Sequence, residues 1–205
     1  MDGVFMKKAV KILFILYILC SVLAGLGLLR DKCTLRSDLI RFHVVGASNA
    51  EEDQTVKLQV RDAVIEAISE PLSACADVLQ AEQYLRQHLD DIRQVAQKTL
   101  ADAGFFDDVQ VSIAEEAFPC RDYDTFSLPS GVYRSLRITI GKGEGRNWWC
   151  VMFPRLCIGA VAEDTTEVFS INDSLNNTIS RQKGYEVRFF LLDILGKIEN
   201  FFYRG

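Results

Sequence analysis

The stretch that decides the fold runs from residue 39 to residue 68 and reads LIRFHVVGASNAEEDQTVKLQVRDAVIEAI. Its first part alternates between two faces, as expected for a half-buried strand. One face carries the apolar side chains and the other the polar ones: Ile40, Phe42 and Val44 against Arg41 and His43. After Gly46 the apolar residues recur every three or four positions, as on one side of an α-helix. A strand followed directly by an amphipathic helix indicates a sheet that packs against helices.

This first helix has signals for both of its ends. Ser48 or Asn49 can cap its start, each with a glutamate three residues further on, and Pro71 is expected to stop it. A second helix is predicted from about Asp77 to Ala103, followed by a glycine. The apolar stripes of both helices are interpreted as core.

Alternation predicts three more strands, at residues 109–113, 136–140 and 148–153, paired mostly antiparallel. The sequence therefore predicts an α+β fold, in which a small, mostly antiparallel sheet carries two helices on one face. The globular domain is placed at residues 36–158. An N-terminal signal or anchor helix precedes it, and a C-terminal amphipathic helix follows it.

The N-terminus is typical of an export signal. Lys7, Lys8 and Lys11 precede residues 12–29, which contain no charged side chain. The apolar run is longer than an ordinary signal core and about as long as a membrane-spanning helix. The small residues Val22 and Ala24 make cleavage plausible. Residues 1–29 are thus a signal peptide or a membrane anchor, and both alternatives stay open.

The remaining chain is acidic, with 20 Lys and Arg side chains against 27 Asp and Glu beyond residue 29. Nucleic acid and anionic lipid are poor partners for such a domain. Cys20 lies in the apolar run, which leaves five of the six cysteines in the rest of the chain. Cys150 and Cys157, with Pro154 between them, are expected to form a disulfide outside the cytosol. The alternative is that both are reduced and buried.

The end of the chain divides into two parts. Residues 159–183 are polar and acidic and are interpreted as a linker. Residues 184–205 have the apolar spacing of a helix with a dense content of large side chains. Such a helix can bind a membrane surface or a partner helix, or it can pack back on its own domain.

No known catalytic, cofactor or metal motif is recognisable. Gly141, Gly143 and Gly145 lack the trailing Lys-Ser/Thr of a phosphate-binding loop, and a hairpin-like loop explains them. His43 and His88 accompany no nucleophile signature, and the spacing of the cysteines provides no second ligand pair for zinc. We therefore expect no enzymatic activity, no cofactor and no metal.

Two pairs of adjacent carboxylates could suggest a glycosidase. Glu115 and Glu116 form one pair, and Asp107 and Asp108 form the other. Neighbouring residues of a strand point to opposite faces, however, so neither pair can act on one bond. We expect all four side chains to be solvated.

The most unusual segment is Asn147-Trp148-Trp149-Cys150. Adjacent strand residues face opposite ways, so at most one of the tryptophans can enter the core. The other is either covered by the C-terminal helix or is an anchor for a partner protein.

Four blocks in this order resemble the stage II sporulation protein R family of endospore-forming bacteria. They cover most of residues 39–158 and are Leu39–Val44, Glu52–Val64, Leu128–Tyr133 and Gly141–Val151, the last leading through Phe153-Pro154 to Cys157. Where the family usually has Ala-Asn-Ser-Asp after the first strand, this chain has Gly46-Ala47-Ser48-Asn49.

The resemblance implies a signalling protein that is made in the forespore and exported to the forespore membrane or the intermembrane space. Its implied partner is a membrane-embedded sporulation protease of the mother cell, an aspartic protease that processes the sigma-E precursor. The hypothetical contact surface comprises Asn147, Trp148 and Trp149, helped by Arg41 and His43 if these are exposed. The alternative function is a secreted cell-wall hydrolase that uses His43 or the paired carboxylates.

Overall fold

The computed structural model describes residues 2–123, 127–154 and 185–204. The helices are α1 (Asp2–Ser37), α2 (Glu51–Ser73), α3 (Val78–Gln87), α4 (Leu89–Asp102) and α6 (Tyr185–Arg204). The strands are β1 (Ile40–Val45), β2 (Val109–Phe118), β3 (Arg121–Asp122), β4 (Ser127–Leu128), β5 (Gly131–Ile140) and β6 (Asn147–Phe153). The predicted linker, residues 159–183, lies outside the described residues.

The main sheet has the strand order β2-β5-β1-β6. β2 pairs antiparallel with β5 and β6 antiparallel with β1, whereas the central pair β1 and β5 is parallel. A parallel pair needs a crossover connection, and here α2, α3, α4 and β2 lie between the two strands in the chain. β3 and β4 form a separate small hairpin.

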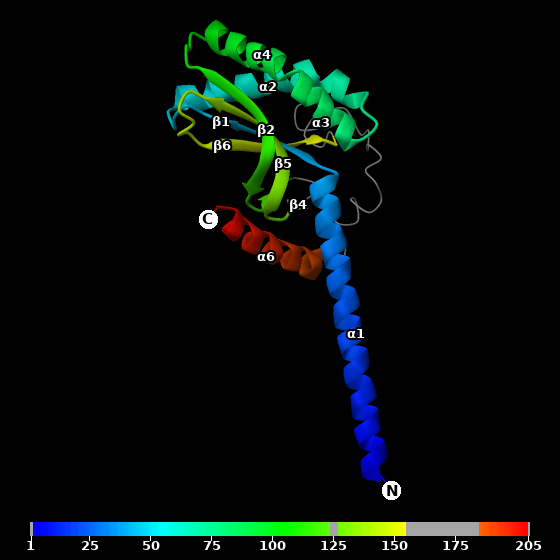
Figure 1. Cartoon of the computed structure of the whole chain (residues 1–205). Coiled ribbons are helices and arrows are strands. Elements are labelled where there is room, and N and C mark those ends of the chain that lie inside the picture. The colour runs from blue at the N-terminus through cyan, green and yellow to red at the C-terminus, as the bar shows by residue number, and fades with distance from the viewer. Residues whose placement is uncertain (1, 124–126, 155–184, 205) are drawn as a thin grey trace.

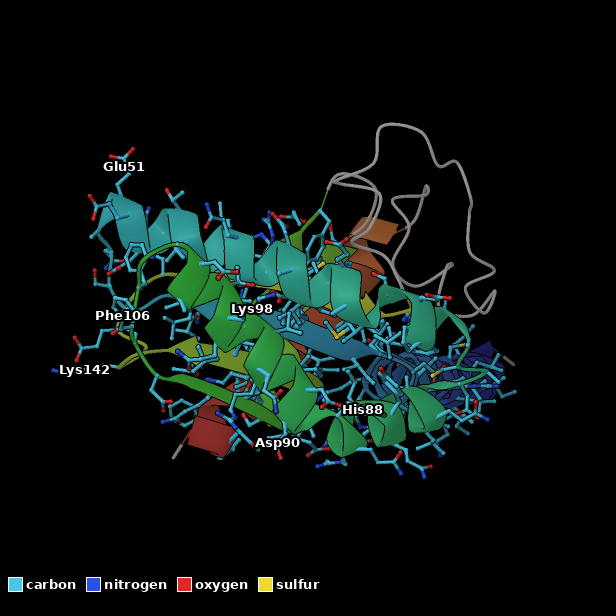
Figure 2. All side chains as sticks on the ribbon, turned by 90° about the horizontal axis from the view of Figure 1, so that it is seen from above. Glu51, His88, Asp90, Lys98, Phe106 and Lys142 are labelled. Carbon is cyan, nitrogen blue, oxygen red and sulfur yellow. The ribbon has the colours of Figure 1, made fainter. Side chains whose placement is uncertain are left out.

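One face of the sheet is covered by α2 and α4, which lie side by side above it in Figure 2. The core on this face combines the apolar side of β1 with the stripes of the helices. Its buried members include Phe42, Val60, Val64, Ala96, Leu100 and Leu136. Burying a Val, Leu or Phe side chain from water stabilises the fold by about 1.5–3 kcal/mol.

The opposite face of the sheet is covered by α6, which runs beneath the strands in Figure 1. A second apolar cluster lies here, built from Leu35 of α1, Leu39, Phe118, Tyr133, Val151 and Leu192 of α6, among others. The sheet is therefore the middle of three layers, and both of its faces are packed.

α1 leaves the domain as a long single helix (Figure 1). Within it, Lys11–Ser37 is long and apolar enough to cross a membrane, and the most apolar part of this segment is not buried against the domain at all. The predicted segment of residues 1–29 is thus part of a helix that continues to Ser37. Its last turns pack on the domain through the buried Leu35.

The predicted fold class is confirmed: an α+β domain with a mostly antiparallel sheet, an apolar N-terminal helix and a C-terminal helix. Two local expectations need revision. The helix predicted from 77 to 103 is divided at His88, whose backbone departs from helical geometry with ψ of 20°. The first helix continues two residues past Pro71, which lies in its last turn.

Candidate functional site: the tryptophan edge of the sheet

The two adjacent tryptophans of β6 point to opposite faces, as predicted. Trp148 faces α2, where its ring meets Phe42 edge-on at 5.8 Å and the guanidinium of Arg61 lies 4.8 Å from its centroid. Trp149 faces the α6 side and stacks on His43, its direct neighbour on β1, with ring centroids 4.8 Å apart. Both tryptophans are partly buried and Asn147 is exposed. We call Asn147, Trp148 and Trp149 the tryptophan edge.

The glycine loop before this edge is held by the turn that follows β1. The amide of Gly145 donates to the Gly46 carbonyl at 2.9 Å, and the amide of Arg146 donates to Oδ1 of Asn49 at 2.9 Å. A Cβ on Gly145 would overlap the backbone of Ser48. The sequence suggested that this loop is a hairpin, but it is not one. Since β1 lies between β5 and β6, the loop crosses the end of β1 and needs glycine for close backbone approach.

A buried lysine of α2 links the glycine loop to α2 by hydrogen bonds. Lys57 is 5% exposed, and its Nζ donates to Oε1 of Gln54 at 2.6 Å and to the carbonyl of Arg146 at 3.1 Å. Gln54 in turn donates to the carbonyl of Ser48 at 2.7 Å. Burial and the nearby cations Arg146 and Arg61 lower the pKa of Lys57. Two of the blocks that carry the family resemblance, Glu52–Val64 and Gly141–Val151, thus meet at one end of the sheet and position the tryptophan edge.

A charged network lies behind Trp149. Nε2 of His43 is 2.5 Å from a carboxylate oxygen of Glu116, whose other oxygen accepts from Arg137 at 3.1 Å. Burial raises the pKa of the Glu116 carboxyl, but the contacts with His43 and Arg137 lower it by more, so the pKa lies below its ordinary value. The expectation that Glu116 is solvated was wrong, because its carboxylate is partly buried and contacts His43 and Arg137. Asp107 and Asp108 are exposed, as expected.

Arg41 and His43 lie on the predicted face of β1, but they are not exposed. Arg41 is 0% and His43 4% exposed, because α6 and the β3–β4 hairpin cover this face of the sheet. The Arg41 guanidinium lies 4.2 Å from the ring centroid of Phe118 and donates to the hydroxyl of Tyr123 at 2.9 Å. Aromatic faces stabilise such a buried cation. Arg41 therefore holds the hairpin on the sheet, and its role in partner binding stays a prediction.

A cavity of about 320 Å³ opens beside the network. Its lining residues come from five elements, β1, β2, β5, β6 and α6, and are His43, Glu116, Ala117, Arg137, Asn147, Trp149 and Tyr203. The cavity offers a partner the aromatic rings of Trp149 and Tyr203, an amide and both signs of charge. Within the described part of the chain, no group of three or more His, Cys, Asp or Glu side chains is arranged to hold a metal ion.

Sequence reasoning missed Glu116, Arg137 and Tyr203 as members of this site. Strand alternation could have placed Arg137 on the face of His43, since the two are paired across β1 and β5, but only once that parallel pairing is known. His88 is remote: it lies where α3 passes into α4 and stacks on Tyr84 (Figure 2). Cys150 is buried, and Cys157 lies outside the described residues, so the disulfide stays a prediction.

These features define a class: a small α+β domain carried behind an N-terminal helix of membrane-spanning length, with an aromatic edge strand beside a charged cavity. The chain belongs to the stage II sporulation protein R family, whose model matches residues 36–163. It is 31% identical to the stage II sporulation protein R of Bacillus subtilis (strain 168) over 161 residues, which cover 74% of this chain and 71% of the relative. No solved structure matches the chain. Family membership supports a role in sporulation.

Proposed function

We propose that this protein is an exported intercellular signal of sporulation that activates a membrane-embedded aspartic protease, which then processes the sigma-E precursor. The observation that carries the proposal is the tryptophan edge. It is presented on an edge strand next to a cavity, in a domain that directly follows a helix of membrane-spanning length. Family membership supports the sporulation role of the same domain.

Activation by such a protein is binding rather than bond chemistry. A ligand shifts its receptor only by its differential affinity for the active state. Partly exposed tryptophans are frequent anchors of protein interfaces, and removing one typically costs about 2 kcal/mol or more of binding energy. Trp149 has the better geometry for this role, since its ring borders the cavity and is already fixed by its stack on His43.

The test is co-expression with the protease and its precursor substrate, with precursor cleavage as the readout. Trp149→Ala is expected to abolish cleavage, and Trp148→Ala to reduce it. Phe106→Ala is the matched control, because this aromatic side chain is 87% exposed in the loop between α4 and β2. Intact cleavage with both tryptophan variants, exported at normal levels, would refute the assignment of the surface.

The dependence on location is tested separately. The full chain is compared with a version lacking residues 1–29, which is expected to accumulate without crossing the membrane. Precursor processing by the full chain alone supports the proposal that export is part of the signal. Equal processing by both versions contradicts it.

One contact favours a second candidate, a secreted cell-wall hydrolase. A histidine and a carboxylate within 2.5 Å of each other at the wall of a cavity resemble an oriented general base. Release of soluble fragments from purified peptidoglycan, lost in Glu116→Gln with the fold retained, would support a hydrolase. A wild-type protein that releases nothing would exclude it.

A further inference from the structure

α6 presents an apolar surface that its own domain does not use. The residues that face the sheet are Leu192, Asp193, Gly196 and Asn200, whereas most of its large apolar residues face away. The outward set, here called the outer face of α6, consists of Phe190, Leu191, Ile194, Ile198, Phe201 and Phe202, which are 37–77% exposed. An ordinary surface helix has the reverse arrangement, with its apolar stripe on the core.

The inward side of α6 is firmly docked, so the outer face has a fixed direction. The Asp193 carboxylate accepts from the amide of Ser130 at 2.9 Å and from the hydroxyl of the same residue. Nδ2 of Asn200 donates to the carbonyl of Phe118 at 2.8 Å, and the Tyr203 hydroxyl donates to the carbonyl of Glu115 at 2.6 Å. α6 is thus a rigid part of the domain, although it lies outside the residues matched by the family model.

The last turns of α1, which follow its apolar run, pass directly beside α6. Glu199 of α6 pairs with Lys32 at 3.0 Å and with Arg36 at 3.4 Å. These two cations lie three and seven residues beyond Leu29, the end of the uncharged run, which corresponds to about 5 and 10 Å along a helix with a rise of 1.5 Å per residue. The polar layer on each side of a bilayer is about 5–8 Å thick. α6 therefore lies at the depth of the membrane surface when α1 spans the bilayer.

The direction of the outer face agrees with this depth. Figure 1 shows the sheet on one side of α6 and the N-terminal part of α1 on the other. Since the inward side of α6 contacts the sheet, the outer face points toward the region that holds the apolar run of α1. We propose that the outer face of α6 inserts into the surface of the same bilayer that α1 enters, as a second membrane contact of the domain.

The composition of the outer face indicates the kind of lipid. The described cations at α6 are all paired with carboxylates: Lys197 with Asp193 at 2.8 Å, and Lys32 and Arg36 of α1 with Glu199. The chain as a whole is acidic. Membrane insertion is therefore driven by burial of large apolar side chains and not by attraction to anionic lipid. Zwitterionic phosphatidylcholine is sufficient for the contact. This inference does not depend on the proposed activation of a protease.

The test is photolabelling of the full chain reconstituted in phosphatidylcholine vesicles that contain a phosphatidylcholine with a photoreactive acyl chain. Labelled sites are mapped by mass spectrometry. Labels are expected on α1 and on residues 190–202 of α6, with none near Phe106, which is more exposed than any residue of the outer face but lies on the other side of the sheet. Labels on α1 alone would overturn the proposal, as would cross-links from α6 to a second copy of the chain.

A pair of variants makes the test specific. Phe201→Ser combined with Phe202→Ser should lower labelling of α6 to the level found at Phe106. Both side chains are at least 74% exposed, so this change leaves the packing of the domain intact. Phe106→Ser is the control and should leave labelling of α6 unchanged. Undiminished labelling of the double variant overturns the proposal.

Discussion

Substituting Gly196 tests whether α6 is docked as tightly as its contacts indicate. Gly196 lies on the inward side of α6, against the turn between β4 and β5. A Cβ at this position would overlap the carbonyl group of Ser130 and would lie 3.0 Å from the amide nitrogen of Gly131. These are backbone atoms of a packed turn, so they cannot rotate away as a side chain could. Gly196→Ala must therefore move α6 off the turn.

The expected loss of stability follows from the contacts that are lost when α6 moves off the turn. In an isolated helix, Ala in place of Gly is favourable by roughly 0.5–1 kcal/mol. Against this gain stands the exposure of Leu192, which is 2% exposed in the fold and contributes about 1.5–3 kcal/mol. The hydrogen bonds of the Asp193 carboxylate to Ser130 contribute about 1.5–3 kcal/mol more. We expect Gly196→Ala to lower the free energy of unfolding by about 2–5 kcal/mol.

The assay is urea unfolding of the full chain in mild detergent, together with hydrogen exchange of the α6 amides. Ile198→Ala is the control, because Ile198 is 51% exposed on the outer face of the same helix and its truncation should change stability by less than about 0.5 kcal/mol. Faster exchange in α6 is expected for Gly196→Ala only. If Gly196→Ala unfolds at the wild-type urea concentration and α6 exchanges as slowly as before, the docking described here is refuted.

Three further predictions concern the sheet and the cysteines. Because the pKa of Glu116 is lowered in the fold, its contribution to stability is present above about pH 4.5 and is lost as the pH falls below that value. Glu116→Gln should therefore lose less unfolding free energy than wild type between pH 6 and pH 3, and equal losses would contradict the assigned contacts. Arg41→Ala should lower stability by more than about 2 kcal/mol in thermal unfolding. Arg41→Met, which keeps the buried stem, should cost less, and the reverse order would show that burial of the stem does not contribute to stability. Cys157→Ser should cost about 2 kcal/mol if the disulfide with Cys150 forms. A free thiol at both positions in the oxidised protein would rule the disulfide out.

The sequence predicts well those features that local spacing determines. Alternation over residues 39–45 and the helical stripe after Gly46 depend only on neighbours in the chain, and both the strand and the helix are present. The opposite directions of Trp148 and Trp149 follow from the geometry of one strand. In long, strongly periodic segments the local sequence alone determines the type of element and which side chains share a face, so the fold class could be predicted from them.

The burial of Arg41 and His43 could not be predicted in this way. Alternation assigns them to the face opposite Phe42, which is correct, but it does not say what covers that face. The covering elements are the β3–β4 hairpin and α6, which lie about 80 and more than 140 residues further along the chain. The parallel pairing of β1 with β5 likewise joins residues 94 positions apart, such as Arg41 and Ser135. The contact of Glu116 with His43 depends on both, and no local pattern indicates it.

The position of α6 bears on whether the domain is released from the membrane. A cut after Ala24, which the small residues there permit, would remove the first part of α1 but leave α6 and its outer face with the domain. The freed chain would then still hold an apolar surface suited to a bilayer, so it would stay on membranes instead of diffusing as a soluble protein. Tyr203 lines the same cavity as Trp149, and Phe202 beside it belongs to the outer face. Insertion of the outer face would thus place the tryptophan edge close to a membrane surface, with or without cleavage of α1. A membrane-embedded protease, the partner we propose, would be accessible there.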